Sequence, residues 1–435
     1  MSTSSLAQSD SADSGAHPQV SPGEIAVGVV IGRASEYFDF FVFGIACSLV
    51  FPSEFFPFLP RLDATLWSFV IFAFAFIARP VGTLLAMELQ RRFSRETKLT
   101  AALFLLGTCT AGIAFLPGYD SLGAASIVLL ALLRIGQGLA LGGSWDGLPS
   151  LLALHAPPQK RGWYAMLGQL GAPLGFVMAA SLFAFLVGNL DSADFLDWGW
   201  RYPFFVAFAV NVVALFARLQ LVANEEFSGM LVQRELEPVR LSDMPRSQVA
   251  NLFIGAFAAL ASFALFHLVT VFPLSWITLF TKVPVTEFLV IQIVGGFIAA
   301  AATVGSGLLA DRLGRRNTLA SLAICIAVFS GFTPVLLAGG KLGAYVFIIL
   351  GFALLGLSYG QAAGAVTSNF ETRFRYIGAA LTSDLAWLIG AAFAPVVALG
   401  LSAQFGLAWV SVYLLSGAAG TLAALWINKA LMTRD

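Results

Sequence analysis

The sequence is a succession of long apolar runs separated by short polar turns. A run of about 20 apolar residues can cross roughly 30 Å of hydrocarbon as a helix. Of the 435 residues, 58% are hydrophobic and 11% are charged, whereas soluble domains have about 25% charged residues. The sequence therefore predicts an all-α membrane protein with twelve transmembrane helices. The runs lie at about 25–51, 64–87, 99–117, 123–153, 163–189, 203–222, 249–281, 287–310, 318–338, 342–366, 375–399 and 404–430.

The order of these runs predicts two halves. The turn "RRFSRETKL" (91–99) follows the second run, and the similar "DRLGRRNTL" (311–319) follows the eighth. Two parallel six-helix repeats, related by an axis along the membrane normal, form a known transporter architecture. We therefore expect two pseudo-symmetric six-helix bundles. The expected divisions are a disordered cytoplasmic tail (1–24), an N-terminal bundle (25–222), a central cytoplasmic loop (223–248), a C-terminal bundle (249–430) and a short cytoplasmic tail (431–435).

The distribution of Lys and Arg predicts the orientation. Cytoplasmic loops of membrane proteins carry an excess of these residues. Only Arg61, Arg201, Lys282 and Lys341 fall in one set of loops, and Arg33, Arg79 and Arg134 fall within helices. The other Lys and Arg residues fall in the opposite loops or at the termini, which predicts two cytoplasmic termini. The first residues lack the basic start and apolar stretch of a signal peptide, so we expect a multi-pass protein of the inner membrane.

Several classes of function are not supported by any motif. The three cysteines (Cys47, Cys109 and Cys325) lie in apolar runs, without a disulfide framework or metal-ligand spacing. The sequence has no ATP-binding G-x-x-x-x-G-K-[ST] motif and no nucleophile–base pair. A net charge of zero gives no basic footprint for nucleic acid. We expect no enzyme activity, no metal and no cofactor other than a coupling proton, and we expect a monomer.

The segment "GSGLLADRLGRRNTL" (305–319) combines glycines, which allow helix ends to approach, with one acid and a basic cluster. It resembles the signature loop of the major facilitator superfamily. The resemblance implies a gating role, away from substrate, for this loop and for its counterpart in the N-terminal half. The residues concerned are Gly305, Asp311, Arg312, Gly314, Arg315 and Arg316, with Arg91 and Arg95 in the counterpart.

Further stretches, in the expected order, resemble the metabolite:proton symporters of that superfamily, which include permeases for α-ketoglutarate, dicarboxylates, shikimate and proline or betaine. The resemblance implies proton-coupled transport of a small metabolite. The stretches are "GRASEYFDFFVFG", "FIARPVGTL", "RIGQGLALGG", "HAPPQKRGWYAMLGQLGAPLGF", "WGWRYPFF" and "RFRYIGAALTSDLAWLIG".

This chain also departs from the family pattern. Arg91 stands where the family has an Asp in the N-terminal signature loop, and Ser144 and Leu154 stand where it has acids. The N-terminal half has therefore lost its acidic latch partners, unless Glu88 or Asp146 replaces them. The resemblance supports the fold and the general activity better than it supports a particular substrate.

Charged residues inside the apolar runs are the candidates for function. A charge at the centre of a bilayer costs about 2.5–3.5 kcal/mol on insertion scales, so such residues usually face the bundle interior and mark ion or substrate paths. On a helix, Arg33, Glu36 and Asp39 share one face. Arg33 can neutralise Glu36, which leaves Asp39 as the spare acid. A carboxylate in a low-dielectric cavity suits reversible proton binding, although a structural ion pair is the alternative for both acids.

The other charged candidates each have two interpretations. Arg134 and Gln137 share a face and either line the cavity or hold a backbone carbonyl. Arg79, before Pro80, either faces the interior or extends outward to the membrane surface. Asp384 is either a second protonatable site or the partner of an Arg across the bundle, such as Arg33. His267 either relays protons or packs as a hydrogen-bonded core residue. Additional expected cavity residues are Tyr37, Gln292, Trp276, Gln361 and Tyr359.

Together these features predict a secondary transporter that moves a small organic anion, a mono- or dicarboxylate, with protons by alternating access. Buried Arg33 and Arg134 favour an anion because a guanidinium group forms charge-assisted hydrogen bonds with a carboxylate. Two alternatives remain: uptake of a zwitterionic osmolyte of the proline or betaine type, and a non-transporting receptor that kept the fold. Osmosensing relatives carry a long C-terminal tail, whereas this sequence ends a few residues after its last apolar run.

Overall fold

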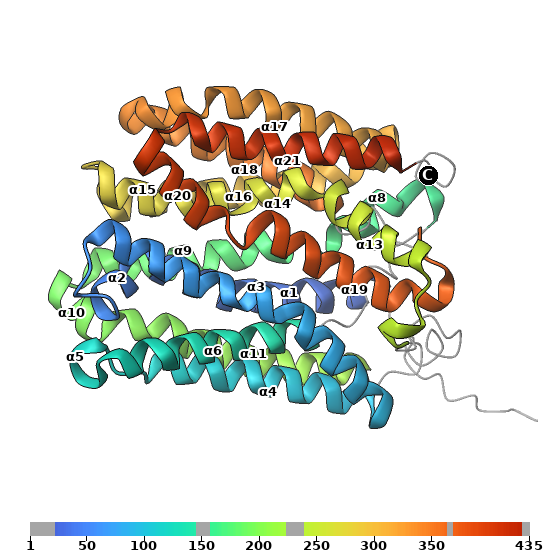
Figure 1. The fold of residues 1–435 in the computed structure, drawn as a ribbon, viewed down its shortest axis with the longest axis horizontal. Helices are drawn as coiled ribbons and strands as arrows, with labels where there is room; N and C mark the ends of the chain where they lie inside the picture. The colour runs from blue at the N-terminus through green and yellow to red at the C-terminus, as the bar shows by residue number, and fades with distance from the viewer. Residues whose placement is uncertain (1–21, 145–156, 223–238, 363–368, 429–435) are drawn as a thin grey trace, which may run out of the picture.

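The computed structural model describes residues 22–144, 157–222, 239–362 and 369–428. Within these segments the chain forms helices and turns and contains no β-strand. The long helices run roughly parallel to one another along the longest axis of the molecule (Figure 1).

The first half of the described chain supplies six spans, and the fifth consists of two consecutive helices. The spans are α1 (Pro22–Leu49), α3 (Arg61–Arg92), α4 (Arg95–Ala114), α6 (Ala124–Gly143), α8 (Arg161–Leu167) with α9 (Gly171–Asn189), and α11 (Tyr202–Val222). Short helices lie in the connections: α2 (Phe51–Glu54), α5 (Tyr119–Leu122) and α10 (Ser192–Asp197).

The second half also supplies six spans, of which the seventh and eleventh are interrupted. They are α13 (Arg246–Ala258) with α14 (Leu260–Thr270) and α15 (Phe272–Phe280), α16 (Val285–Leu313), α17 (Arg315–Ala338), α18 (Gly340–Ala362), α19 (Arg375–Ala386) with α20 (Ala394–Phe405), and α21 (Ala408–Ile427). A π-helical turn, Trp387–Ala391, joins α19 to α20.

The prediction of twelve transmembrane helices is confirmed. Among the described residues, eleven helical segments are long and apolar enough to cross a membrane. The remaining span is the first, α1, which has 28 residues. It carries Arg33, Glu36 and Asp39 and is less apolar for that reason. The second span is longer than the apolar run expected at 64–87, because its helix continues through polar residues at both ends as Arg61–Arg92.

The internal repeat is visible in how neighbouring helices pack. A Cβ atom at Gly138 of α6 would lie 2.3 Å from the carbonyl oxygen of Ala75 in α3. A Cβ atom at Gly356 of α18 would lie 2.3 Å from the carbonyl oxygen of Ala299 in α16. Since real Cβ atoms do not approach so closely, only glycine allows these backbones to touch. The second and fourth spans of each half therefore pack in the same way.

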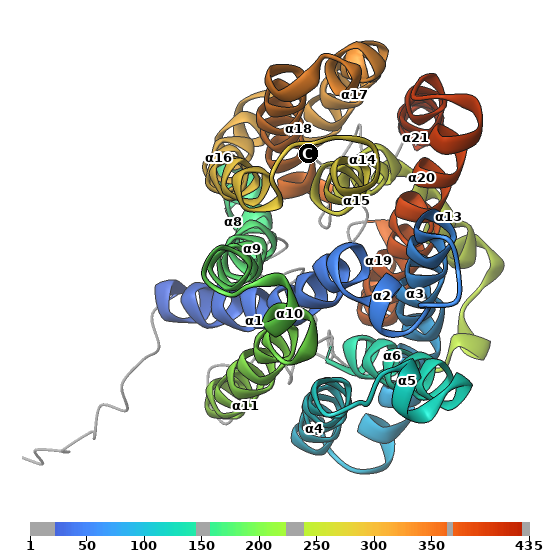
Figure 2. The same cartoon turned by 90° about the vertical axis from the view of Figure 1, so that its left-hand side faces the viewer.

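The two halves meet along two lines of contact. In the α8–α16 seam, α8 and α9 pack against α16; in the α3–α19 seam, α3 packs against α19 and α20. Viewed along the helices, α9 lies beside α16 on one side of the molecule, and α3 lies beside α19 on the other (Figure 2). Between the seams, α1 contacts α15. A residue near the middle of these helices is therefore well placed to face both halves.

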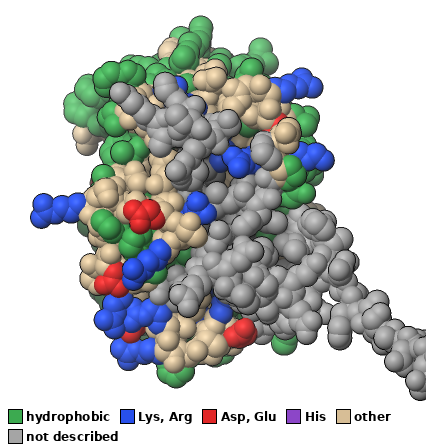
Figure 3. All heavy atoms as spheres, turned by 90° about the vertical axis from the view of Figure 1, so that its right-hand side faces the viewer, with side chains coloured by type: hydrophobic (Ala, Val, Ile, Leu, Met, Phe, Trp, Pro, Cys, Tyr) green, Lys and Arg blue, Asp and Glu red, His purple; other side chains and the backbone are tan. Residues whose placement is uncertain are grey.

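One end of the molecule is rich in basic side chains, and we call it the basic end (Figure 3). The opposite end carries Arg61, Arg201, Lys282 and Lys341 among the described residues. Those at the basic end are Arg91, Arg92, Arg95, Lys98, Lys160, Arg161, Arg240, Arg246, Arg312, Arg315, Arg316, Arg373 and Arg375.

Candidate functional site

Aromatic side chains from both halves fill the contact near the middle of the helices. The ring of Trp387 lies 5.9 Å from the ring of Phe40 in α1 and 4.9 Å from that of Phe266 in α14. The Tyr37 hydroxyl of α1 contacts the Tyr359 hydroxyl of α18 across the two halves. We call this group the central aromatic cluster. Its members are Tyr37, Phe40, Phe72, Phe76, Phe263, Phe266, His267, Tyr359 and Trp387.

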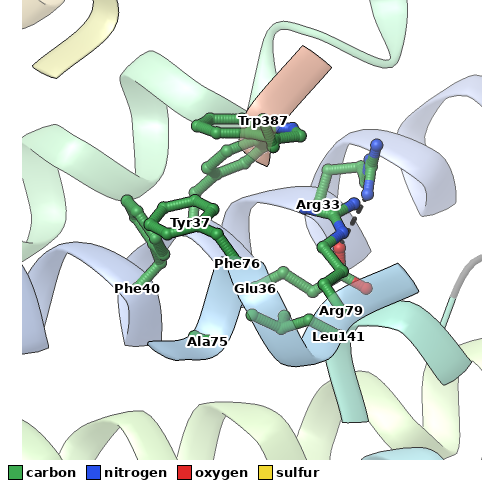
Figure 4. A pocket seen from close by; sticks show the side chains of 9 residues that line it. All are labelled: Arg33, Glu36, Tyr37, Phe40, Ala75, Phe76, Arg79, Leu141 and Trp387. Atoms are coloured by element: carbon green, nitrogen blue, oxygen red, sulfur yellow. Dashed lines mark hydrogen bonds and ion pairs between the residues drawn. The ribbon is translucent and has the colours of Figure 1, made fainter. Parts of the chain in front are cut away.

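A small cavity adjoins the central aromatic cluster (Figure 4). Its free volume for water is about 20 Å³, enough for a water molecule, which needs about 10–15 Å³. In this conformation the cavity therefore has no room for a metabolite, and side chains must move before one binds there. The cavity is lined by Arg33, Glu36, Tyr37, Phe40, Ala75, Phe76, Arg79, Leu141 and Trp387.

Arg33 and Glu36 form an ion pair on the wall of the cavity. One nitrogen of Arg33 lies 2.8 Å from a Glu36 carboxylate oxygen, and the Ser144 hydroxyl donates to the other oxygen at 2.7 Å. Glu36 is 5% exposed. The spacing of three residues on α1 brings the two charges together, as the sequence predicted. A serine at position 144, where the family has an acid, thus donates a hydrogen bond to this pair.

Asp39 lies one turn further along α1 but faces the interior of the N-terminal half. Its carboxylate accepts hydrogen bonds from Thr110 of α4 at 2.7 Å, Asn211 of α11 at 3.1 Å and Gln137 of α6 at 3.2 Å. It forms no ion pair within the described part of the chain, and it is 2% exposed. Asp39 is therefore the acid without a paired Arg, as predicted, although it does not line the cavity.

Arg134 approaches Asp39 through Gln137. Its guanidinium group donates to the Gln137 side-chain oxygen at 2.9 Å, while the amide of Gln137 donates to Asp39. Arg134 also donates to the Phe72 carbonyl at 3.3 Å and lies 4.0 Å from the centre of the Phe43 ring. One terminal nitrogen of Arg134 has no hydrogen-bond partner among the described residues. Of its two predicted positions, Arg134 therefore has the one at a backbone carbonyl, and neither Arg134 nor Gln137 is among the residues that line the cavity.

Asp384 forms an ion pair with Arg79 across the α3–α19 seam. The Arg79 Nε atom lies 2.7 Å from one carboxylate oxygen, and the Thr83 hydroxyl donates to the other at 2.5 Å. Arg79 is 9% exposed and Asp384 is 2% exposed. Arg79 therefore faces the interior and does not extend to the membrane surface. Of the two interpretations of Asp384, the structure has the pairing across the bundle, but with Arg79 in place of Arg33.

His267 is fully buried among the aromatic rings of the central cluster. Its ring lies 5.3 Å from that of Phe40 and 6.0 Å from that of Trp387. The Nδ1 atom is 3.5 Å from the Thr270 hydroxyl, and Nε2 has no hydrogen-bond partner among the described residues. Among the described residues, His267 therefore has one weak polar contact and no chain of hydrogen bonds, so its environment is that of a packing residue more than of a proton relay.

Three other expected cavity residues have structural contacts. Gln292 donates to the carbonyls of Val269 and Thr270 at 3.3 and 2.9 Å, where the seventh span is interrupted. It therefore satisfies backbone groups that the break leaves free. Trp276 packs on Phe280, with ring centres 4.3 Å apart, and does not line the cavity. Gln361 donates to the Gly162 carbonyl at 3.2 Å.

Asp311 connects the two halves at the basic end. Its carboxylate accepts hydrogen bonds from the backbone N–H groups of Gly162 at 2.7 Å and Trp163 at 3.2 Å, at the start of α8. Arg315 donates to the Arg161 carbonyl at 3.3 Å and Arg316 to the Leu425 carbonyl at 3.1 Å. This geometry agrees with the expected gating role of the loop, whereas Arg312 is exposed.

The glycines of this loop differ in their roles. Gly314 ends α16 with φ +80°, a conformation that favours glycine. A Cβ atom at Gly305 would meet only Leu357, at 3.9 Å, so Gly305 does not provide the close approach expected of it. Gly307 does, since a Cβ atom there would lie 3.0 Å from the Trp163 backbone.

The counterpart loop in the N-terminal half uses different residues. Arg91 and Arg92 pair with Glu88 of their own helix at 2.9 and 2.8 Å, so Glu88 does not replace the missing acid across the seam. Lys98 of α4 donates to the Tyr376 hydroxyl of α19 at 2.8 Å, and this hydroxyl donates to Gln90 of α3 at 3.2 Å. Asp146 and Leu154 lie outside the described residues. Arg95 is buried at the same end.

Sequence reasoning missed Thr110, Asn211, Thr83, Lys98 and Tyr376. Asn211 and Thr110 bind Asp39, Thr83 binds Asp384, and the last two join the halves. The available signal was a polar side chain inside an otherwise apolar run, as in "VAFAVNVVALF". Such residues are expensive in a membrane unless they have partners. No cluster of three His, Cys, Asp or Glu side chains suited to a metal occurs in the segments that the structure describes.

Twelve spans in two similar bundles, with buried charges and a cavity where the bundles meet, are the architecture of one class of membrane transporters. The chain belongs to the Major Facilitator Superfamily, whose family model matches residues 29–389. It is therefore a transporter, not an enzyme.

Two curated relatives and one solved structure illustrate the likeness. The chain is 35% identical over 417 residues to the inner membrane metabolite transport protein YhjE of Escherichia coli (strain K12), covering 94% of this chain and 95% of the relative. It is 28% identical over 403 residues to the shikimate transporter of the same strain, covering 90% and 91%. The crystal structure of a D-xylose-proton symporter superposes with a TM-score of 0.70 at 20% identity, covering 94% and 97%, which shows a shared fold. The chain is a multi-pass inner membrane protein that carries a small molecule.

Proposed function

We propose that the protein transports a small organic anion together with a proton by alternating access, with the basic end in the cytoplasm. The orientation is supported by the excess of Lys and Arg at that end among the described residues (Figure 3). The aromatic contact between the halves lies near the middle of the spans, where transporters of this architecture bind substrate.

The observation that carries the proposal is a balance of buried charge. In the middle of the described spans, three guanidinium groups (Arg33, Arg79 and Arg134) accompany three carboxylates (Glu36, Asp39 and Asp384). An anion that enters adds one negative charge to this low-dielectric interior, which is costly without compensation. One proton taken up by a carboxylate restores the balance. Entry of a monovalent anion is therefore favoured together with one proton.

The anion is expected at Arg33 and Arg79, because both guanidinium groups line the cavity. Each is held by an acid in this conformation, Glu36 and Asp384 respectively. A substrate carboxylate forms the same kind of charge-assisted hydrogen bond as these acids and so competes with them for the guanidinium groups.

Asp39 is the acid that we assign to the coupling proton. Before substrate binds, protonating Glu36 or Asp384 would break an ion pair and leave a buried guanidinium uncompensated, which is strongly unfavourable. Protonating Asp39 breaks no ion pair within the described chain, since its three partners are neutral donors. Asp39 shares α1 with Arg33 and Glu36, so a movement of α1 affects both sites.

The experiment compares accumulation with exchange in proteoliposomes. In Asp39→Asn we expect loss of pH-gradient-driven accumulation of a transported acid, with exchange of labelled for unlabelled acid retained, because exchange needs no net proton movement. Asp63→Asn, on an exposed residue of α3, is the matched control and should behave as wild type. Full gradient-driven accumulation in Asp39→Asn would show that another acid carries the proton. Uptake of proline or a neutral sugar with no uptake of any acid would contradict the anion assignment.

A further inference from the structure

The cavity has two chemically different ends. Arg33, Glu36 and Arg79 gather on one side, while Tyr37, Phe40 and Trp387 lie on the other (Figure 4). Behind the aromatic side lie further rings, including Phe266, whose centre is 4.9 Å from that of Trp387. A ligand that fills this space therefore meets cations at one end and aromatic faces at the other.

From this arrangement, and resting on the proposed function, we propose that the substrate is a monocarboxylate whose acid group is attached to a ring. The carboxylate binds Arg79 and Arg33, and the ring packs between Trp387 and the side chains of α1 and α3.

The guanidinium groups lie directly beside the aromatic rings, so a ligand that enters after the side chains move meets both. The guanidinium carbon of Arg79 lies 6.0 Å from the centre of the Trp387 ring, and that of Arg33 lies 5.9 Å from the centre of the Tyr37 ring. A carboxylate at either guanidinium group thus has its attached carbon atoms beside an aromatic face. Ring-to-ring packing of this kind contributes beyond the area that it buries.

Polar atoms suited to one hydroxyl group lie at and behind the aromatic end of the cavity. The Nε2 atom of His267 is buried without a hydrogen-bond partner among the described residues, and its ring lies 5.8 Å from that of Phe76, which lines the cavity. The hydroxyls of Tyr37 and Tyr359 contact one another beside the same rings. A ring hydroxyl opposite the carboxylate would find a partner here, which an unpartnered buried nitrogen otherwise lacks.

The side chains that line this cavity suit an open-chain dicarboxylate less well. With one carboxylate at the guanidinium groups, its second would face ring surfaces, whose quadrupole is negative on the face. The described residues that line the aromatic side include no cation. A second buried carboxylate would therefore remain uncompensated.

Trp387 occupies a special position in the backbone. It begins the π-helical turn Trp387–Ala391 that interrupts the eleventh span, and the residue three positions before it, Asp384, pairs with Arg79. Turns of this kind occur frequently at functional sites. The segment from Asp384 to Trp387 therefore supplies both an aromatic wall of the cavity and the counter-ion of Arg79.

The test is calorimetric titration of the purified full-length chain with 4-hydroxybenzoate, succinate and butyrate. We expect 4-hydroxybenzoate to bind about fivefold more tightly than either open-chain acid, since aromatic packing contributes about one kcal/mol and tenfold corresponds to about 1.4 kcal/mol. In Trp387→Leu this preference should be lost, with 4-hydroxybenzoate weakened by about fivefold and the open-chain acids little changed. Trp387→Phe should keep most of the affinity. Trp198→Leu, at a partly exposed tryptophan in the loop before α11, should match wild type.

Four outcomes would overturn the proposal. Equal or tighter binding of succinate or butyrate contradicts it even if the variants do not fold. An equal loss for all three acids in Trp387→Leu assigns Trp387 a structural role and removes the evidence for ring recognition. If the open-chain acids are transported above the empty-liposome background and the ring acid is not, the anion transport function stands and the ring inference fails. If no acid binds, the ring inference and the proposed anion transport both fail.

Discussion

The two seams between the halves close the basic end in different ways. In the α8–α16 seam, the Asp311 carboxylate accepts hydrogen bonds from backbone N–H groups of α8, and Gly162 and Gly307 allow the helices to touch. In the α3–α19 seam, side chains meet side chains: Lys98 and Gln90 bind the Tyr376 hydroxyl, and Arg79 pairs with Asp384 deeper in the membrane.

The loops after the second span of each half are thus near contacts between the halves at the same end of the molecule, but different chemical groups form these contacts. The N-terminal signature loop lacks the acid of the family pattern, yet an ammonium–phenol–amide contact joins the halves at that seam. The α3–α19 seam also carries a charge pair that borders the cavity. Opening this seam must separate or rearrange Arg79 and Asp384, so its closure depends on the charge in the cavity, whereas closure at Asp311 does not.

The largest effect is expected from Asp384→Asn. Removing one partner of a buried ion pair costs about 3–5 kcal/mol, because the remaining charge is uncompensated. We expect uptake to fall below about one per cent of wild type, since each 1.4 kcal/mol corresponds to tenfold. Proteoliposome uptake and thermal unfolding check this. The double variant Arg79→Met with Asp384→Leu should recover thermal stability without transport. Uptake near the wild-type level in Asp384→Asn would mean that the α3–α19 seam does not depend on this pair.

A smaller effect is expected from Asp311→Ala. The variant loses two hydrogen bonds to a charged group, which contribute about 1.5–3 kcal/mol each when buried and less at a partly exposed end. We expect roughly a tenfold shift in the ratio of open to closed basic ends, from about 1.4 kcal/mol. The measurement is labelling of a cysteine introduced at Leu141 on the cavity wall, in a Cys325→Ser background because Cys325 is exposed. Asp243→Asn, exposed at the same end, is the control. Unchanged labelling would show that Asp311 does not act as a latch.

The smallest effect of the three is expected from Tyr376→Phe, which removes only the hydroxyl that Lys98 and Gln90 contact. A typical hydrogen bond contributes about 0.5–1.5 kcal/mol, so labelling at the same cysteine should rise by about two- to tenfold. Glu88→Gln serves as the comparison, because its pairs with Arg91 and Arg92 lie within one helix. If Glu88→Gln changes labelling as much as Tyr376→Phe does, the contact at Tyr376 is not what closes this seam.

The fold could be predicted from the sequence because its signals are strong and local. Apolar runs fix the twelve helices, and the spacing of Arg33 and Glu36 fixes their pairing on α1. The repeated glycines at Gly138 and Gly356 were present in the sequence, but their role required knowing which backbones touch. The sequence shows the spacing of residues along one helix. Contacts with other helices also depend on how each span is rotated about its own axis and on its depth in the membrane, which the sequence does not show.

For that reason the contacts between helices were predicted less well. Asp384 was expected either to bind a proton or to pair with an Arg across the bundle, and nothing in the sequence distinguishes Arg79 from Arg33 as its partner. Asp39 was expected near the cavity with Glu36, yet a step of three residues rotated it toward Thr110 and Asn211. The outward orientation considered for Arg79 is wrong because Asp384 compensates its charge in the interior.

The balance of three guanidinium groups and three carboxylates is the centre of this account, and proton movement across a liposome membrane tests it most directly. A pH-sensitive dye in the lumen reports proton entry when the tightest-binding acid is added outside, with empty liposomes as the background. The account predicts acidification of the lumen, with one proton entering for each molecule of the monocarboxylate that is transported. The rate of this acidification should not change when the membrane potential is clamped. The account also predicts no such acidification in Asp39→Asn. The account is contradicted if wild type shows no acidification above the background, or if the rate of acidification depends on the membrane potential. It is also contradicted if Asp39→Asn still acidifies the lumen.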